Sequence, residues 1–404
     1  MKKLALYTTL FVLFGAMAGC DSFVGDVDQP IDSIDDTQLN SESQIEFVIK
    51  GVQSRFSTTY DRISLHAGGL SDELFFDQRV PNATFPTYAE IDEGVIEFAN
   101  NSNDGVYNAL GELRFFADNL LARAAEITFE DTDLQQEATF TGNLYGGIAR
   151  YFYATYFGLD IDGGGGGIIT EDPANPGPFI PAPEMYTQAL AKLNAALGLA
   201  DDYNARAINT LIARIQLIQG NTAEARTAAL AGMQEGDAPF QSLHSVDNSN
   251  EWYVQAGVGR TQWVVDFRYE GYIANDPNEA NRIQLQDITG SDGTVFKRQG
   301  RYIDRSTPIA FATWQENELM LAELDLASDP AGALARVNAV RASHGIDPLG
   351  ALDQSTLIVE REKELFTMGL RLVDERRFDI WHLGPDTWQY FPITQNERNI
   401  NTNI

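Results

Sequence analysis

Two pairs of amphipathic segments, each joined by a very short break, constrain the fold of this chain most strongly. The first pair spans residues 204–234 and turns at Gly220, with alanine side chains on the contact face of its second member. The second pair spans residues 308–343 and breaks at Pro330, a residue tolerated in the first turn of a helix. Segments spaced in this way predict antiparallel helical hairpins, which bury their apolar faces by stacking on neighbours.

Further segments with helical periodicity surround these pairs. Residues 44–58 and 107–127 each carry one apolar stripe, and residues 181–199 form another helical segment. Residues 134–157 carry aromatic side chains on too many faces for a surface helix, so we expect a central core helix there. Each hairpin has about the size of one tetratricopeptide repeat, roughly 34 residues. The expected helical hairpins span about 107–157, 183–235 and 308–343.

Two regions lack this periodicity and are where we expect a ligand. Residues 236–306 gain aromatic side chains among glycine, asparagine and aspartate, which predicts a loop-rich insertion with short strands. Within it, residues 263–269 (WVVDFRY) are β-branched and aromatic at close to period two. This spacing predicts a strand, with Trp263 and Phe267 in the core. The second loop-rich region is residues 68–103.

The N-terminal segment predicts export and lipidation. Two lysines precede an apolar stretch shorter than the about 20 residues needed to span a bilayer, and small residues then lead to Cys20, the only cysteine. A lone cysteine cannot form an internal disulfide. We therefore expect residues 1–19 to be a lipoprotein signal peptide, Cys20 to carry the lipid, 20–40 to be a flexible tether and 41–404 to be one folded domain. An ordinary cleaved signal with an incidental cysteine is the alternative.

Charge and motif content exclude several classes of function. The chain has 28 basic and 58 acidic residues, a net charge of −30, which disfavours nucleic acid and anionic lipid as partners. Neither an HExxH nor a GxSxG motif is present. Asp160 and Asp162 before the glycines 163–167 resemble part of a calcium loop, but the remaining ligands are missing and a flexible linker is the favoured interpretation. We expect no metal and no cofactor.

The most specific pattern lies near the C-terminus. Residues 360–378 read EREKELFTMGLRLVDERRF, which resembles the SusD/RagB family motif E-R-x-x-E-L-x-x-E-G-x-R-x-x-D-L-x-R. Met368 replaces the glutamate that is usual in the family, and Glu375 replaces the usual leucine. On a helix, such charged residues can pair along a partly buried surface, which favours a structural clamp over a ligand site. The matching positions are Glu360, Arg361, Glu364, Leu365, Gly369, Arg371, Asp374 and Arg377.

Other segments extend the resemblance over nearly the whole chain. The closing residues 390–404 are similar to the family's terminal F-P-I-P-x-x-E segment, with Thr394 in place of the second proline. Residues 333–346 match its A-L-x-x-[IL]-N-x-V-R-x-R-A-G pattern. The helix end at 151–161 and the SDE run at 71–73 also fit.

The resemblance implies an architecture and a role. It implies a SusD-like fold of tetratricopeptide-type hairpins, on a surface-exposed lipoprotein anchored in the outer membrane. Family members capture oligosaccharides or peptides and deliver them to a SusC-like TonB-dependent transporter, without catalysis. The residues themselves leave two other classes open: a lipid-anchored enzyme that degrades glycans, and a helical-repeat scaffold that binds proteins.

Aromatic and polar side chains in the two loop-rich regions are the candidate ligand contacts. Aromatic rings stack on the apolar faces of sugars, while Asp, Asn and Arg form hydrogen bonds with hydroxyl groups. Any of these rings would equally suit the core. The candidates are Phe75, Arg79, Tyr88, Trp252, Tyr253 and Tyr272.

Overall fold

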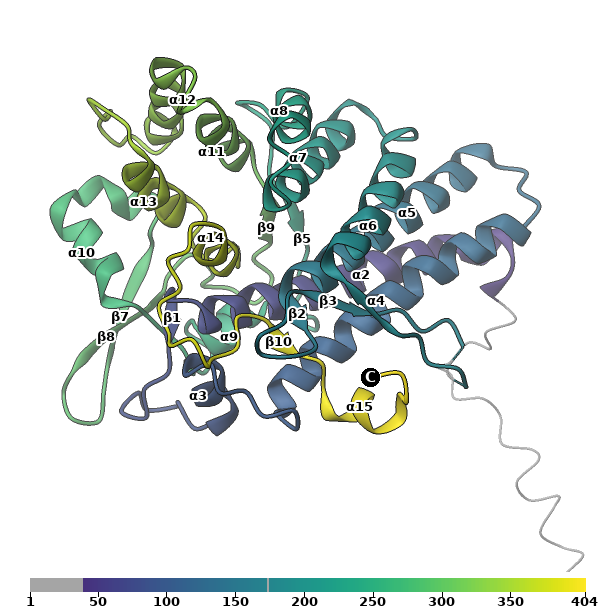
Figure 1. The fold of residues 1–404 in the computed structure, drawn as a ribbon, viewed down its shortest axis with the longest axis horizontal. Helices are drawn as coiled ribbons and strands as arrows, with labels where there is room; N and C mark the ends of the chain where they lie inside the picture. The colour runs from purple at the N-terminus through teal and green to yellow at the C-terminus, as the bar shows by residue number, and fades with distance from the viewer. Residues whose placement is uncertain (1–38, 173) are drawn as a thin grey trace, which may run out of the picture.

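Helices dominate the computed structural model, which describes residues 39–172 and 174–404 (Figure 1). The expected all-α-dominated fold class is thereby confirmed. The predicted signal peptide, Cys20 and nearly all of the predicted tether lie outside the described residues. Within the described ranges, no helix combines the length and the apolar composition that crossing a bilayer requires.

Long helices alternate with very short strands along the described chain. The helices are α2 (Glu42–Leu70), α3 (Pro86–Asp92), α4 (Asn101–Glu126), α5 (Thr132–Tyr156), α6 (Ala182–Leu197), α7 (Asp202–Ile218), α8 (Thr222–Leu230), α9 (Glu251–Gln255), α10 (Phe267–Asn275), the 3₁₀ helix η2 (Pro277–Asn281), α11 (Trp314–Asp325), α12 (Pro330–Ser343), α13 (Gln354–Glu364), α14 (Arg371–Arg377) and α15 (Gln395–Ile400). The strands are β1 (Leu74–Phe75), β2 (Phe157–Gly158), β3 (Gly166–Ile168), β4 (Phe179–Pro181), β5 (Phe240–Ser242), β6 (Val264–Val265), β7 (Leu285–Thr289), β8 (Val295–Gln299), β9 (Ile309–Ala312) and β10 (Phe391–Pro392).

Neighbouring helices pack as antiparallel pairs, and the strands tie distant segments together. The pairs α4–α5, α7–α8 and α11–α12 form hairpins, and α6 packs on α5. The sheet with strand order β1-β6-β8-β7 joins the chain after α2 to the insertion between α8 and α11. Strand β10, close to the C-terminus, pairs in parallel with β2 at the end of α5. In Figure 1, α10 and the β7–β8 hairpin of the insertion lie on one side of the molecule, opposite the loop that joins α4 to α5, while β5 and α9 lie near the centre.

The aromatic helix α5 is buried in the core, as its sequence predicts. The Phe152 ring stacks on Tyr60 of α2, with ring centroids 6.1 Å apart. Phe311 of β9 meets the Tyr60 ring edge-on at 4.9 Å. All three side chains are at most 2% exposed. The core is therefore centred where α2, α5 and β9 meet.

Helix α2 is twelve residues longer at its C-terminal end than the periodicity predicts. The added turns, residues 59–70, are buried on almost every face, so no amphipathic stripe marks them. Gly68 and Gly69 lie within these turns, against the rings of Trp252 and Trp263. A side chain at Gly69 would overlap the Trp263 ring, so glycine is required there for close packing.

The predicted strand at 263–269 is mostly wrong. Only Val264 and Val265 form a strand, because the Asp266 side chain accepts a hydrogen bond from the Arg268 backbone N–H and starts helix α10. Trp263 is buried as expected. Phe267 is not a core residue, since its position in the first turn of α10 leaves it 47% exposed.

Two other expectations also need correction. The helix predicted from residue 308 starts only at Trp314, because residues 309–312 pair with β5 and the Thr313 side chain caps α11. The glycines at 163–167 are not simply a linker, since Gly166 and Gly167 pair with β4. A side chain at Gly167 would overlap the Tyr153 ring, so this part of the run allows close packing on α5.

The C-terminal motif spans two helices instead of one. Helix α13 ends at Glu364, and α14 begins at Arg371. Thr367 and Gly369 between them have φ angles of 72° and 71°, which reverse the chain direction. Arg371 and Asp374 both lie on α14 but do not pair with each other, because Arg371 binds Asp72 while Asp374 binds Arg361 and Arg377.

Buried ion pairs join this motif to the rest of the molecule. Asp374 accepts two hydrogen bonds from Arg361, at 2.8 and 2.9 Å, and another from Arg377 at 3.1 Å. Glu360 lies 2.7 Å from both Arg282 of the insertion and Arg341 of α12. These side chains are at most 12% exposed. These charged side chains are removed from water and have several partners. They therefore hold the insertion, α12 and the C-terminal motif together.

The chain just after α2 forms part of the same cluster. Asp72 accepts two hydrogen bonds from Arg371, at 2.6 and 2.8 Å, and one from Arg268 of α10 at 2.7 Å. Glu364 pairs with His344 of α12 at 3.0 Å. Together these contacts connect the chain just after α2 with the C-terminal motif.

We predict that one buried carboxyl in this cluster makes stability depend on pH. Burial raises the pKa of Glu73 from 4.5 to about 8. Between these values the folded chain keeps the proton and the unfolded chain loses it, so stability falls as pH rises through this window. Glu73→Gln should remove the part of that fall that comes from Glu73 and keep the acceptor for the Thr367 N–H, whose nitrogen lies 3.1 Å away. At pH 8 we expect a stability gain of a few kcal/mol, from about 1.4 kcal/mol per pKa unit.

Thermal unfolding of both proteins between pH 5 and 8 measures this effect. The wild-type midpoint should drop relative to that of the variant as pH rises. Glu93→Gln, at an exposed position, is the control and should follow the wild type. Parallel curves for wild type and Glu73→Gln would contradict the prediction.

Candidate ligand-binding site

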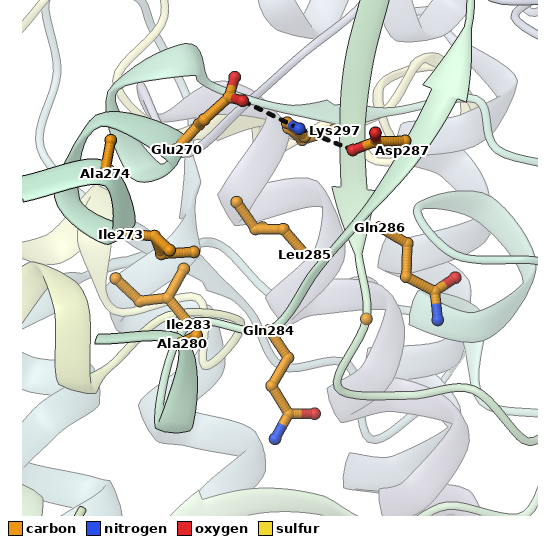
Figure 2. A pocket seen from close by; sticks show the side chains of 11 residues that line it. Glu270, Ile273, Ala274, Ala280, Ile283, Gln284, Leu285, Gln286, Asp287 and Lys297 are labelled. Atoms are coloured by element: carbon orange, nitrogen blue, oxygen red, sulfur yellow. Dashed lines mark hydrogen bonds and ion pairs between the residues drawn. The ribbon is translucent and has the colours of Figure 1, made fainter. Parts of the chain in front are cut away.

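A hollow of about 530 Å³ opens in the insertion, between α10, η2 and the β7–β8 hairpin (Figure 2). Its apolar wall comes from Ile273 of α10, Ile283 after η2, and Leu285 of β7. Short side chains at Ala274 and Ala280 keep the space between these elements open. The volume lies within the range of about 300–1,000 Å³ that is typical of small-ligand sites.

Charged groups line one side of the hollow. The Lys297 ammonium lies 2.6 Å from Asp287 and 2.9 Å from Glu270, so one cation bridges two carboxylates (Figure 2). Hydrogen bonding to Asp287 and Glu270 raises the pKa of Lys297. The two carboxylates are 70% and 48% exposed, which leaves oxygen atoms free to accept hydrogen bonds from a ligand.

Two amide side chains, Gln284 and Gln286, complete the lining (Figure 2). The hollow thus combines an apolar wall with acceptors and donors fixed on a hairpin. This combination suits a polyhydroxylated ligand, since a sugar presents apolar C–H faces beside hydroxyl groups.

Phe75 and Arg79, two of the candidates from the sequence, lie close together but not in this hollow. The Phe75 ring lies 5.5 Å from Phe267 and 6.1 Å from Phe296, and the Arg79 guanidinium lies 5.1 Å from the Phe296 centroid. Phe296 neighbours Lys297 on β8, so the two side chains point to opposite faces of the sheet. This partly exposed aromatic group therefore lies behind the hollow.

Tyr88 and Trp252 belong to the core. Tyr88 is 5% exposed and stacks on Trp263 with centroids 5.0 Å apart. Trp252 is fully buried, and its indole N–H donates to the Ser64 hydroxyl at 2.9 Å. In this conformation neither ring is accessible to a ligand.

Tyr253 and Tyr272 occupy two further, separate places. Tyr253 is half-buried, with the Arg305 guanidinium 6.0 Å from its ring. The Tyr272 hydroxyl donates to Glu362 of α13 at 3.1 Å, on the side of α10 away from Ile273. Of the six candidates, the structure brings together only Phe75 and Arg79.

Sequence reasoning missed the residues that line the hollow. Ile273 and Leu285 look like ordinary apolar positions, and nothing in the sequence distinguishes Lys297 from a surface lysine. One usable signal was the pair of alternating runs, 285–289 and 295–299, around the turn at Gly293, which indicates a β-hairpin. Among the described residues, no group of three or more His, Cys, Asp or Glu side chains is placed to hold a metal ion.

The arrangement of helical hairpins and inserted sheet is similar to the fold of solved SusD superfamily structures. A SusD superfamily protein from Bacteroides thetaiotaomicron matches at 16% identity over 90% of this chain and 99% of its own, with a TM-score of 0.73. A laminarin-binding SusD-like protein matches at 15% identity over 89% and 98%, with a TM-score of 0.73. A SusD-like carbohydrate-binding protein from Bacteroides vulgatus matches at 16% identity over 90% and 97%, with a TM-score of 0.68.

These similarities confirm, at the level of the fold, the resemblance found in the sequence motifs. No family model matches the sequence, and no curated protein matches it.

Proposed function

We propose that this protein is a surface-exposed outer-membrane lipoprotein, anchored through Cys20, that captures oligosaccharides and delivers them to a SusC-like TonB-dependent transporter. The observation that carries the proposal is the hollow beside Lys297, with its apolar wall and free carboxylates, in a fold shared with carbohydrate-binding proteins. The role is capture without turnover. The chain releases its cargo chemically unchanged.

The lining of the hollow supports a glycan as the cargo. Side chains on a hairpin and a neighbouring helix are held before the ligand arrives, which lowers the entropic cost of binding. Ile273 and Leu285 offer contact to the C–H face of a sugar ring. Asp287 and Glu270 flank Lys297, and carboxylate acceptors form stronger hydrogen bonds with hydroxyl groups than neutral acceptors do.

Removing one of these acceptors tests the site. For an oligosaccharide that binds the wild type, we expect Asp287→Ala to weaken affinity about 10- to 100-fold, as for loss of a hydrogen bond to a charged group worth about 1.5–3 kcal/mol. Titration calorimetry against a panel of oligosaccharides and peptides measures this. Thr289→Ala, on the same strand outside the hollow, should bind like the wild type. Equal affinity of all three proteins would place the site elsewhere.

Delivery and anchoring need experiments of their own. Tagged protein purified from detergent-solubilised outer membranes of its host should co-elute with a TonB-dependent barrel. A protein that elutes alone would contradict the transport role and favour a free enzyme or a scaffold. Mass spectrometry of the mature N-terminal peptide should show acylation at Cys20, and an unmodified cysteine would exclude the lipid anchor.

A further inference from the structure

A second hollow, of about 600 Å³, lies far from the insertion hairpin. It is bounded by α2, α5, α7 and residues 239–248, and we call it the hairpin groove. It shares no lining residue with the hollow beside Lys297. In Figure 1, α5, α7 and the N-terminal half of α2 lie apart from α10, β7 and β8, while the C-terminal end of α2 reaches β1.

Aromatic rings form one wall of the hairpin groove. The Phe56 ring lies 5.0 Å from Tyr145 and 6.1 Å from Phe240, so the rings of three elements support one another. Tyr203 of α7 is half-buried, and its hydroxyl donates to the Ala238 carbonyl at 3.2 Å. Ring positions fixed in this way offer a rigid apolar platform at low entropic cost.

Three amide side chains among the lining residues form no hydrogen bonds within the described fold. Within residues 39–172 and 174–404, the side chains of Gln53, Gln241 and Asn248 form no hydrogen bond with other described residues. Each carries both donors and an acceptor. Lining groups that the fold leaves unpaired, beside a fixed aromatic wall, are available to a ligand.

The groove carries almost no charge in a chain whose net charge is −30. Lys50 is the charged lining residue, and it pairs with Glu46 at 2.6 Å on the exposed rim. His244 is neutral at neutral pH, because burial lowers its pKa to about 4. A short peptide brings ionised termini, and the inside of the groove offers no charged partner for them. An acidic sugar would be repelled by the net negative charge of the protein.

We propose that the hairpin groove is a second binding site, which takes an uncharged segment of an oligosaccharide, with a sugar ring packed on Tyr203 and Phe240 and its hydroxyl groups bound by Gln53 and Gln241. The inference rests on the proposed glycan-binding function and adds a separate place where the cargo is held. Two weak contacts on one long ligand reinforce each other, because the second binding event becomes intramolecular.

Variants in the groove test the proposal. The purified chain is titrated with a panel of uncharged algal, plant and bacterial oligosaccharides, and each that binds is tested on Gln241→Ala and Tyr203→Ala. We expect Gln241→Ala to weaken binding about 3- to 10-fold, the effect of losing one neutral hydrogen bond. Gln216→Ala, at a partly exposed position of α7 outside the groove, is the matched amide control and should leave affinity unchanged. Hydrogen exchange of peptides from 239–248 should slow when the ligand is added.

The outcomes separate this inference from the proposed function. If none of the panel binds the wild type, glycan capture itself is wrong. If a glycan binds the wild type and both groove variants equally, without protecting residues 239–248, the second site is wrong and glycan capture stands. Protection of the groove by a peptide instead of a glycan would also overturn the proposal. Because hydrogen exchange reports on the unmodified protein, a variant that fails to fold does not prevent the decision.

Discussion

Replacing Asp374 with alanine should lower the free energy of unfolding by about 3–5 kcal/mol, the range for removing one partner of a buried ion pair. The carboxylate accepts two hydrogen bonds from Arg361, whose side chain is 5% exposed, and a third from Arg377. Without Asp374, the Arg361 guanidinium stays in the core and loses the partner it faces. Chemical denaturation at neutral pH measures the change in unfolding free energy.

Two comparisons make this test specific. Glu46→Ala breaks an ion pair whose side chains are 65% and 62% exposed, and should cost less than about 1 kcal/mol. Replacing both buried partners with apolar residues, as Arg361→Met with Asp374→Leu, should recover much of the loss, because no uncompensated charge remains. A cost below about 1 kcal/mol for Asp374→Ala would mean that the motif does not hold the chain together.

Replacing Gly369 with alanine should cost about 2–4 kcal/mol, the sum of a left-handed backbone penalty of about 1–2 kcal/mol and a steric term of similar size. Its φ angle is 71°. A Cβ atom there would lie 2.7 Å from the Cα atom of Ser64 in α2, which is backbone and cannot rotate away. The thermal midpoint and the denaturant midpoint should both fall.

Gly220 provides the matched control for this substitution. It has a φ angle of 76° in the turn between α7 and α8, and a Cβ atom there would meet nothing within 4 Å. Gly220→Ala should therefore show the backbone penalty alone, about 1–2 kcal/mol. Equal costs at both glycines would mean that α2 moves aside and that its contact with the motif is loose.

Sequence periodicity predicted those helices that have a solvent-facing side. Helices α4 and α7 keep one apolar stripe, so both were predicted; the bounds of α7 agree within two residues, while α4 begins six residues before its predicted start. The last turns of α2 and the strand β9 are buried on nearly all sides. The spacing of their apolar residues therefore does not distinguish a helix from a strand. In residues 263–269 the capping chemistry of Asp266 outweighed the alternating pattern.

The charged motif was easier to interpret than the ligand site. Charges spaced along 360–378 are costly to bury unpaired, so their pairing could be expected, although their partners Arg282 and Asp72 could not be identified. Aromatic residues such as Trp252 stabilise a core as readily as they bind sugars, so their identity alone cannot locate a site. The hollow beside Lys297 arises from the placement of α10 against a hairpin, which only the tertiary structure defines.

The ion pair between Asp72 and Arg371 joins residues 299 positions apart in the chain. Contacts of such long range form slowly, because a large loop must be closed first. The helical hairpins can form from local contacts. The insertion is fully joined to the rest of the fold only when residues 360–378 pack against it. A chain cut short before residue 371 should therefore lack this cluster and be an easy substrate for proteases.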